Sequence, residues 1–358
     1  MLKGTDFIKR WLWRLLTAIA LIAWIGLLTS AFSDRISPHT ARYVPFLGLF
    51  FPLIFGVNVL MMMVFLVCRK WKQLLAAIAV MAVCWTAIRA YFPLHVKTKE
   101  LPENCVKLLT YNVFYFSMDG LEMPAREHPI IQFIKEQQAD IVCLQEFRSG
   151  KQMTKDAICQ ALSEFPYHAI SPPELAIFSK YPIRSSRKLS KDYHSFLVTL
   201  DVHGKELTLI NNHLASNQIT YDERDEYLSF TKDMNSENFK SFTHLMFRRL
   251  TPAYQRRTTQ VDQIDAEIKK ITTPYIIVCG DFNDTPISYT RHTLMQNDLI
   301  DSFAESGNGI GISFNKNRFL FRIDYILHSK NIKSYNSTVG KIKSSDHYPV
   351  WTYLQLTD

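Results

Sequence analysis

The segment Val278 to Pro286, with the sequence Val-Cys-Gly-Asp-Phe-Asn-Asp-Thr-Pro, carries the residues best suited to chemistry. It overlaps the end of the apolar run Tyr275 to Cys279, which is typical of a buried strand. Asp281 and Asn283 are two residues apart, and side chains at that spacing in an extended segment point to the same side. A carboxylate and a neutral amide therefore converge at the rim of a sheet, an arrangement that suits phosphoryl chemistry.

Five further segments repeat this pattern of an apolar, strand-like run with a polar residue at or near its end. Each of them alone is a weak signal, but the polar residues are of the types that hold metals, move protons or bind phosphate. They are Asn112 in Leu108–Val113, Glu146 in Asp140–Glu146, His213 in Leu207–His213, Asp324 in Arg322–Leu327, and Asp346 with His347 in Ser345–Val350.

In this order, the six segments resemble those of the endonuclease/exonuclease/phosphatase superfamily. This superfamily comprises metal-dependent phosphodiesterases and phosphatases, among them deoxyribonuclease I-like nucleases, abasic-site endonucleases, neutral sphingomyelinases and inositol-polyphosphate 5-phosphatases. The resemblance covers roughly residues 104 to 356. It implies an α/β four-layer sandwich, in which two packed and mostly antiparallel β-sheets are flanked by helices.

Strand-like and helical runs alternate along this region, which favours the same fold. We expect helices over Pro129 to Gln138, Lys151 to Glu164 and Gln255 to Lys270, and a hairpin that turns at His203-Gly204. The stretch from about Ile219 to Leu250 is longer than a connection requires. Three interpretations of this stretch stay open: a substrate lid, a membrane-contacting loop or a solvent-exposed loop without a further role.

A phosphodiester resists hydrolysis because negative oxygens shield the phosphorus and the leaving alkoxide is poor. A divalent ion offsets both effects, and hard oxygen ligands favour Mg²⁺ or Mn²⁺. Glu146 is the best single candidate for a metal ligand. The resemblance implies that Asn112, beside Glu146, and the carboxylate of Asp346 also belong to the metal site.

The resemblance also implies roles in proton transfer and phosphate binding. His347 is the expected general base or proton carrier, paired with Asp324, whose position in an apolar strand requires such a partner. Asp281 is expected to orient or activate the attacking water, and Asn283 to donate to a phosphate oxygen. His213 matches a second histidine, which contacts the phosphate or assists the leaving group. Water is therefore expected to attack directly, without a protein nucleophile.

The N-terminal part of the chain differs sharply from the rest. Residues 15–33 and 43–68 contain no charged side chain, and each run is long enough to cross a hydrocarbon core of about 30 Å as a helix. Leu74 to Ile88 is a third, shorter apolar run. We therefore expect about three transmembrane helices within residues 1–96, then a linker over 97–104 and a catalytic domain over 105–358. A signal peptide would explain only the first run.

Basic residues gather between positions 3 and 14 and again at 69–72, whereas the first loop holds only Arg35 and Arg42. The positive-inside rule then puts the N-terminus in the cytoplasm, and three crossings put the catalytic domain on the other side of the inner membrane. The spans carry no acidic residue, which speaks against a transport component.

Charge is distributed unevenly between the two regions. The net charge of +8 arises within residues 1–96, and the remainder of the chain is neutral. Domains that hold long nucleic acid usually show a basic excess. A lipid or small phosphoester substrate is therefore slightly favoured over DNA or RNA, and a nuclease of the same superfamily stays open as the alternative. A catalytically silent module that binds phosphorylated partners is the alternative outside the enzyme class.

The six cysteines show no spacing typical of a zinc site, and four of them lie in apolar runs. A disulfide framework is not expected, and only the pair Cys105 and Cys159 stays open.

Overall fold

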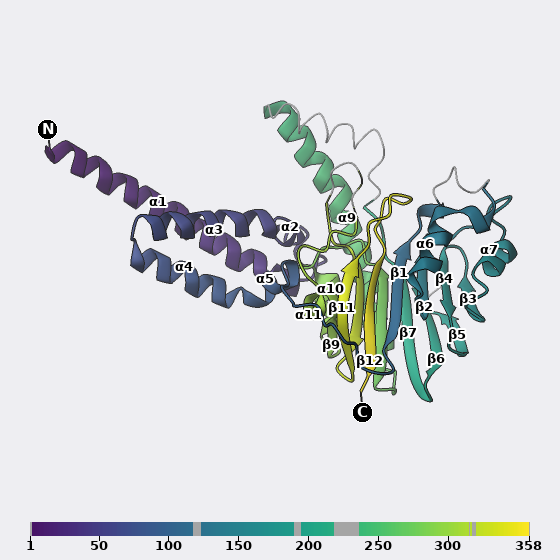
Figure 1. The fold of residues 1–358 in the computed structure, drawn as a ribbon. Helices are drawn as coiled ribbons and strands as arrows, with labels where there is room; N and C mark the ends of the chain where they lie inside the picture. The colour runs from purple at the N-terminus through teal and green to yellow at the C-terminus, as the bar shows by residue number, and fades with distance from the viewer. Residues whose placement is uncertain are drawn as a thin grey trace.

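The structure is a computed structural model that describes residues 2–116, 123–189, 195–217, 236–314, 316 and 320–357. In Figure 1, a bundle of helices from the start of the chain projects from one side of a β-sandwich. The described residues of the sandwich form two six-stranded sheets.

The first sheet has the strand order β11-β12-β1-β2-β4-β3 and the second the order β5-β6-β7-β8-β10-β9. Only two of the strand pairs in the described residues are parallel, β1 with β2 and β7 with β8, so the sheets are mostly antiparallel as expected. The strands of the first sheet are β1 Val106–Asn112, β2 Ile141–Gln145, β3 Tyr167–Ser171, β4 Leu175–Ser179, β11 Ile332–Val339 and β12 Val350–Leu356. Those of the second are β5 Ile183–Lys188, β6 Ser195–Val202, β7 Lys205–His213, β8 Tyr275–Asp281, β9 Leu299–Asp301 and β10 Asp324–Ser329.

Alternation along the strands creates the core between the sheets and the cores outside them. In β1, Leu108 faces the second sheet and Leu109 faces the outer helices, and in β8 Ile277 and Val278 divide in the same way. Successive side chains of a strand point to opposite faces, so a strand covered on both faces is apolar throughout. This explains why these strands are continuous apolar runs in the sequence.

Helices cover the outer face of each sheet and complete the four layers. The first sheet is covered by α6 Pro129–Gln137 and α7 Lys155–Ala161, and the second by α9 Ser236–Ile268 and α10 Tyr289–Met295. α11 Ser302–Ser306 and the 3₁₀ turns η2 Phe114–Phe116 and η4 Ala125–Glu127 connect these elements. The hairpin at His203-Gly204 is confirmed, with φ of 55° and 80° at the two turn residues.

α9 differs from the expected helix. The expectation began it at Gln255, whereas it begins at Ser236 and continues through Pro252. Residues 218–235 of the long stretch lie outside the described part of the chain, and residues 236–250 are helical. The expected inward face, formed by Val261, Ile264 and Ile268, does pack on the second sheet. The first half of α9 instead packs on Phe46, through Leu250 and Tyr254. Because Phe46 lies some 200 residues earlier in the chain, no local sequence pattern indicates this contact.

The expectation of about three transmembrane helices is corrected by the structure. Within the residues that the structure describes, one helix is long and apolar enough to cross a membrane, the span Phe7–Arg35, and the number rises to two only if a bent helix pair counts as one span. The charge-free run 43–68 is divided, because Pro45 begins the short helix α2 and Pro52 lies in the first turn of the next helix. The third apolar run is bent by 69° between Val83 and Trp85. The helices of this N-terminal helical region, residues 2–92, are α1 Leu2–Ala31, α2 Pro45–Leu49, α3 Phe51–Val67, α4 Trp71–Val83 and α5 Trp85–Tyr91, with the turn η1 Ser33–Arg35.

α1, α3 and α4 lie side by side, with the N-terminus at the end far from the sandwich (Figure 1). Small and apolar residues fill the space between them, including Ala20, Phe65 and Ala77. Many large apolar side chains remain on the outside of the bundle, such as Ile22 and Leu75, which are 72% and 66% exposed. All six cysteines of the chain are free thiols, so Cys105 and Cys159 are not joined.

The N-terminal helical region is fixed to the sandwich by specific contacts. Ile287, which precedes α10, packs into the cluster formed by α1, α3 and α5. Arg322 donates from a terminal nitrogen to the Ala90 carbonyl at 2.8 Å, and the backbone amide of Gly309 donates to the Pro93 carbonyl at 2.9 Å. These contacts hold α2 over one end of the sandwich, close to where the sequence motifs meet.

Candidate active site

The sheet register brings three predicted residues into one row. In the parallel pair β7 and β8, His213 lies opposite Asp281, and in the antiparallel pair β8 and β10, Asp281 lies opposite Asp324. Three neighbouring strands therefore present these side chains at the same edge of the second sheet. The carboxylates of Asp281 and Asp324 are almost fully buried, with 1% of each side chain exposed.

Gly280 explains why Asp281 occupies this place. Its φ is +119°, a backbone conformation that other residues rarely adopt, and a Cβ built on it would lie 2.0 Å from the Asn212 carbonyl oxygen. Only glycine lets β8 approach β7 this closely at the last residues of the strand. The Gly-Asp pair of the sequence motif is therefore needed to position the carboxylate.

The first histidine–carboxylate pair is formed by His347 and Asp324. His347 Nδ1 lies 2.9 Å from Asp324 Oδ2, and its Nε2 lies 3.6 Å from Asp281 Oδ2. Burial opposes protonation of the ring, but the two carboxylates outweigh it and raise the pKa of His347 to about 10. Burial is also the main cause that raises the pKa of Asp281 to about 6. Of the two oxygens of Asp324, Oδ1 is buried without a hydrogen-bond partner among the described residues.

A second pair, formed by His213 and Glu174, stands on the other side of Asp281. His213 Nδ1 lies 2.9 Å from Glu174 Oε2, and its Nε2 lies 3.5 Å from Glu146 Oε1 and 4.0 Å from Asp281 Oδ2. Burial lowers the pKa of His213, but the hydrogen bond to Glu174 and the charges of the neighbouring carboxylates produce a net rise. The Tyr115 hydroxyl donates to Glu174 Oε1 at 2.9 Å.

Glu174 and Tyr115 were missed at the level of sequence. Glu174 immediately precedes β4, whereas the motifs were sought at the ends of strands. A carboxylate directly before the apolar run Leu175–Ser179 is the signal that could have found it. Tyr115 lies in η2 and carries no signal of its own.

Asn112 and Glu146 extend the cluster from the first sheet. Asn112 Nδ2 donates to Glu146 Oε1 and to Asp281 Oδ2, both at 3.1 Å, while its Oδ1 accepts from the Phe114 amide at 3.0 Å. In this orientation, the amide group ties the two carboxylates together. Glu146 follows β2 with a φ of 51°, and 16% of its side chain is exposed towards the cavity.

Asn283 holds Asp281 from the other direction. Its backbone amide donates to Asp281 Oδ1 at 2.8 Å, and its Nδ2 lies 3.2 Å from Asp281 Oδ2 and donates to the Leu214 carbonyl at 3.0 Å. The expected contact of Asn283 with a phosphate oxygen stays a prediction.

Asp346 lies at the opposite wall of the cavity, beside Lys316. The Lys316 Nζ is 3.2 Å from Asp346 Oδ2. The Ser345 hydroxyl donates to the Asn112 carbonyl at 2.8 Å, which fastens the segment bearing Asp346 and His347 to the end of β1. All eight residues predicted from the sequence therefore lie around one cavity or in direct contact with its lining.

The donor set fits a hard divalent cation. Asp281, Asp324 and His347 form a group that could hold a metal ion, since one ligand atom of each lies within 4.8 Å of the others. Glu146 and Asp346 add carboxylates that line the same cavity. Carboxylate-rich surroundings suit Mg²⁺ or Mn²⁺. Oδ1 of Asp324, which is buried without a hydrogen-bond partner among the described residues, leaves a carboxylate oxygen for such an ion.

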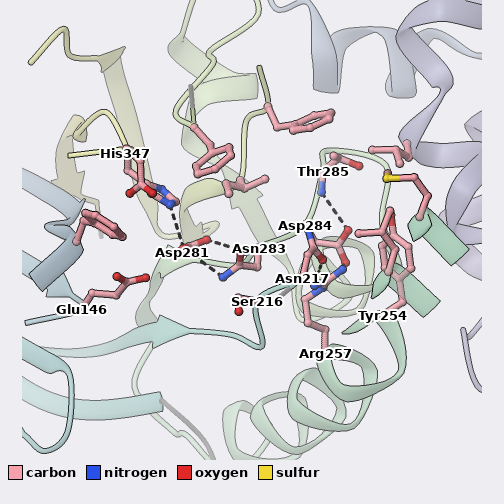
Figure 2. A pocket seen from close by; sticks show the side chains of 18 residues that line it. Glu146, Ser216, Asn217, Tyr254, Arg257, Asp281, Asn283, Asp284, Thr285 and His347 are labelled. Carbon is pink, nitrogen blue, oxygen red and sulfur yellow. Dashed lines mark hydrogen bonds and ion pairs between the residues drawn. The ribbon is translucent and has the colours of Figure 1, made fainter. Parts of the chain in front are cut away.

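The cavity has a volume of about 230 Å³. Figure 2 shows Glu146, Asp281 and His347 on one side of it and Tyr254, Arg257 and Thr285 on the other. Arg257 and Asp284 form a buried ion pair in which Arg257 Nε donates to Asp284 Oδ2 at 3.2 Å. Apolar side chains also line the cavity, including Phe314, whose ring centroid lies 5.0 Å from that of His347. The others are Leu49, Met246, Leu250, Tyr254, Phe321 and Ile323.

Solved structures with a similar chain path include the following proteins. A beta toxin of Staphylococcus aureus is 18% identical, with 69% of this chain and 99% of that chain covered and a TM-score of 0.47. Sphingomyelinase C of Streptomyces griseocarneus is 20% identical, with 71% and 99% covered and a TM-score of 0.46. The human nocturnin catalytic domain with bound sulfate is 16% identical, with 72% and 96% covered and a TM-score of 0.49.

No curated protein matches the chain. Residues 13–91 match the model of a domain family of unknown function, which coincides with the N-terminal helical region. Residues 109–347 match the model of the endonuclease/exonuclease/phosphatase family, and this range holds every residue of the cluster described above. The chain therefore belongs to the endonuclease/exonuclease/phosphatase family.

Proposed function

We propose that this protein is a membrane-anchored, divalent-metal-dependent phosphoric-ester hydrolase in which water is the nucleophile. The observation that carries the proposal is the pair of histidine–carboxylate contacts, His347 with Asp324 and His213 with Glu174, on either side of Asp281. A module that only binds phosphate has no use for two histidines whose rings are each held at one nitrogen by a carboxylate.

Glu146, Asn112 and Asp346 are the residues proposed to hold the metal, and Mg²⁺ or Mn²⁺ is the proposed ion. The group of Asp281, Asp324 and His347, which could also hold an ion, is proposed to act on the water and the proton. When bound, such an ion would offset the charge of the phosphoryl oxygens and of the leaving group. Asn112 keeps Glu146 and Asp281 at a fixed separation through its amide nitrogen.

The protein's own residues are proposed to orient the water, carry the proton and contact the phosphate. Asp281 lies beside both histidines and is proposed to orient the attacking water, held in place by Asn283. His347 presents Nε2 to the cavity while Asp324 holds Nδ1, so the ring can carry a proton at one defined atom. His213 is oriented in the same manner by Glu174 and is proposed to contact the phosphate or the leaving group.

We also propose that the N-terminal helical region lies in the inner membrane and that the sandwich lies outside the cytoplasm. Only 28% of the apolar window in the span Phe7–Arg35 is buried inside the protein, which supports a helix that faces lipid. The basic residues near the start of the chain, Lys3, Lys9, Arg10 and Arg14, favour a cytoplasmic N-terminus. A single crossing by α1 then leaves the sandwich on the opposite side.

The test is a hydrolysis panel with the full chain in detergent micelles. DNA, sphingomyelin and bis-p-nitrophenyl phosphate are each incubated with and without Mg²⁺, and Asp281→Asn serves as the inactive control. We expect Mg²⁺-dependent hydrolysis of at least one ester, with sphingomyelin or the small diester ahead of DNA. Hydrolysis of DNA alone would reassign the protein as a nuclease, and binding without turnover would favour a silent module.

A further inference from the structure

One wall of the catalytic cavity comes from outside the sandwich. Leu49, the last residue of α2, lines the cavity together with Asp281, Asp346 and His347. In Figure 2, helices of the N-terminal helical region approach the cavity on the side of Thr285 and Tyr254. A segment of the proposed membrane anchor therefore forms part of the substrate cavity.

Gly48 allows this close approach. A Cβ built on Gly48 would lie 2.1 Å from the Ile287 carbonyl oxygen, so only glycine permits α2 to rest on the loop before α10. The Tyr91 hydroxyl donates to the Gly48 carbonyl at 3.2 Å, and the Ser30 hydroxyl donates to the Leu47 carbonyl at 2.6 Å. The position of Leu49 is thus fixed from α1, α5 and the sandwich together.

α9 supplies the facing part of the wall. Phe46 of α2 packs on Leu250 and Tyr254, with ring centroids 5.7 Å apart between Phe46 and Tyr254. The Phe247 ring lies 4.6 Å from the Phe46 ring. Leu250 and Tyr254 line the cavity as well, so the contact that joins α2 to α9 continues into the cavity wall.

The lining of the cavity combines polar and apolar side chains. Beside the carboxylates and the polar residues Ser216, Asn217 and Thr285, it contains Leu49, Leu250, Phe314, Phe321 and Ile323. These apolar side chains favour hydrocarbon. The cation beside this wall, Arg257, is already engaged by Asp284, Asn217 and the Ala215 carbonyl.

Exposed apolar residues of the N-terminal helical region flank Leu49 in the chain. Leu47, Phe50 and Leu53 are 37%, 46% and 68% exposed.

We infer that the substrate is an amphiphilic phosphoester, a membrane lipid whose phosphate lies at the carboxylate end and whose hydrocarbon lies between α2 and α9. This inference rests on the proposed function and names its substrate class. The N-terminal helical region is then a specificity element as well as an anchor.

The test uses p-nitrophenyl phosphodiesters that differ only in the second alcohol: ethyl, octyl or the 5′-hydroxyl of thymidine. The full chain is assayed in lipid nanodiscs with Mg²⁺, and kcat/KM is measured for each ester below its aggregation threshold. Each methylene buried in an apolar site contributes up to about fourfold, so we expect the octyl ester to exceed the ethyl ester by about tenfold or more, chiefly through KM. The thymidine ester should not exceed the ethyl ester.

Equal kcat/KM for ethyl and octyl esters, or a preference for the thymidine ester, would overturn the inference and leave the proposed function standing. Hydrolysis of none of the three esters would instead count against the proposed function itself.

Matched variants locate the effect on α2. Leu49→Ser and Gly48→Ala should each lower the octyl-to-ethyl ratio by about threefold or more, because one removes the apolar contact and the other displaces the helix. Leu60→Ser, at an exposed position of α3, and Gly56→Ala, where an added Cβ meets nothing within 4 Å, should keep the ratio of the unmodified chain. The ratio is independent of how much folded protein each preparation contains. Unchanged ratios in both Leu49→Ser and Gly48→Ala would contradict a role for α2.

Discussion

At the scale of single residues, the site is organised around Asp281, which contacts groups from both sheets. The β7, β8 and β10 register places His213 and Asp324 on either side of it, and Asn112 reaches it from the first sheet. Because each histidine has one nitrogen held by its own acid, the two rings are oriented independently of any substrate. This arrangement leads to two predictions on individual side chains.

His347 and Asp324 should behave as one unit. We expect His347→Ala to lower kcat by about 100-fold or more, and Asp324→Asn to lower it by a similar order, because the acid acts through the ring. The double variant should be little worse than His347→Ala alone. Strictly additive losses in steady-state kinetics would assign Asp324 a separate, structural task.

Glu146→Gln should weaken metal binding more than it alters the fold. The substitution keeps the shape of the side chain, and the hydrogen bond with Asn112 can be replaced, but the negative charge is lost. We expect the Mg²⁺ concentration for half-maximal activity to rise about tenfold or more, with an unchanged thermal unfolding temperature. Glu164→Gln, at an exposed position, is the matched control. An unchanged Mg²⁺ requirement would exclude Glu146 as a ligand.

At the scale of elements, a buried ion cluster joins the sandwich to the N-terminal helical region. Asp301, at the end of β9, accepts from Arg291 at 2.8 Å and from Arg322 at 2.9 Å, and its side chain is fully buried. Arg322 also donates to the Ala90 carbonyl of α5. The cluster therefore holds β9, α10 and the anchor at fixed positions next to the cavity.

Asp301→Asn should destabilise the protein strongly, because it leaves two buried arginines without their carboxylate. Breaking one partner of a buried pair typically costs about 3–5 kcal/mol, which corresponds to a fall in Tm of roughly 10 °C for a domain of this size. Asp298→Asn, which removes an exposed pair with Lys330, should change Tm by only about 1–3 °C. Equal effects of the two variants in thermal unfolding would contradict this account.

The buried cluster of Asp301 with Arg291 and Arg322 also predicts that stability depends on pH. Burial raises the pKa of Asp301, but the charges of Arg322 and Arg291 outweigh it and hold the pKa well below its usual range. The stabilisation is thus fully present above the unfolded-state pKa of about 3.9 and is lost as the pH falls towards the folded-state value. The difference in Tm between the unmodified chain and Asp301→Asn should therefore shrink below about pH 4. A difference that stays constant down to pH 2 would show that the charge of Asp301 is not what stabilises the fold.

The strands and most of the site were predictable from sequence, since each motif couples a continuous apolar run to a polar residue at or near its end. The hairpin at His203-Gly204 and the inward face of Val261, Ile264 and Ile268 follow from equally local patterns. The first half of α9 was not predictable in this way, because its apolar side chains pack on α2. Glu174 was also missed because its contact is distant in sequence: its partner, His213, lies 39 residues further along the chain.

At the scale of the whole molecule, the helical bundle decides which substrates the site can meet. The count of membrane-spanning helices was overestimated, because an uncharged run does not reveal where proline or a bend divides it. Among the described residues, the span Phe7–Arg35 alone satisfies the length and composition of a membrane-crossing helix, and the bent pair α4 and α5 is a second candidate if it counts as one span.

A topology reporter distinguishes these arrangements. Alkaline phosphatase fused after Asp358 should be active in cells, because the basic residues in the N-terminal half of α1 favour a cytoplasmic N-terminus and one crossing exports the rest of the chain. Protease added to spheroplasts should then remove the sandwich. An inactive reporter with a protected sandwich would place the site in the cytoplasm, where nucleotides and DNA are the available phosphoesters.

The central claim is that the carboxylate cluster hydrolyses a phosphoester with the help of a divalent ion. The most direct measurement is a Mg²⁺ titration of p-nitrophenol release from bis-p-nitrophenyl phosphate by the chelator-stripped full chain, with Asp281→Asn in parallel. The account predicts no turnover without metal, saturable recovery as Mg²⁺ is added, and no recovery in the variant. Full activity in excess chelator, or an Asp281→Asn variant as active as the unmodified chain, would contradict it.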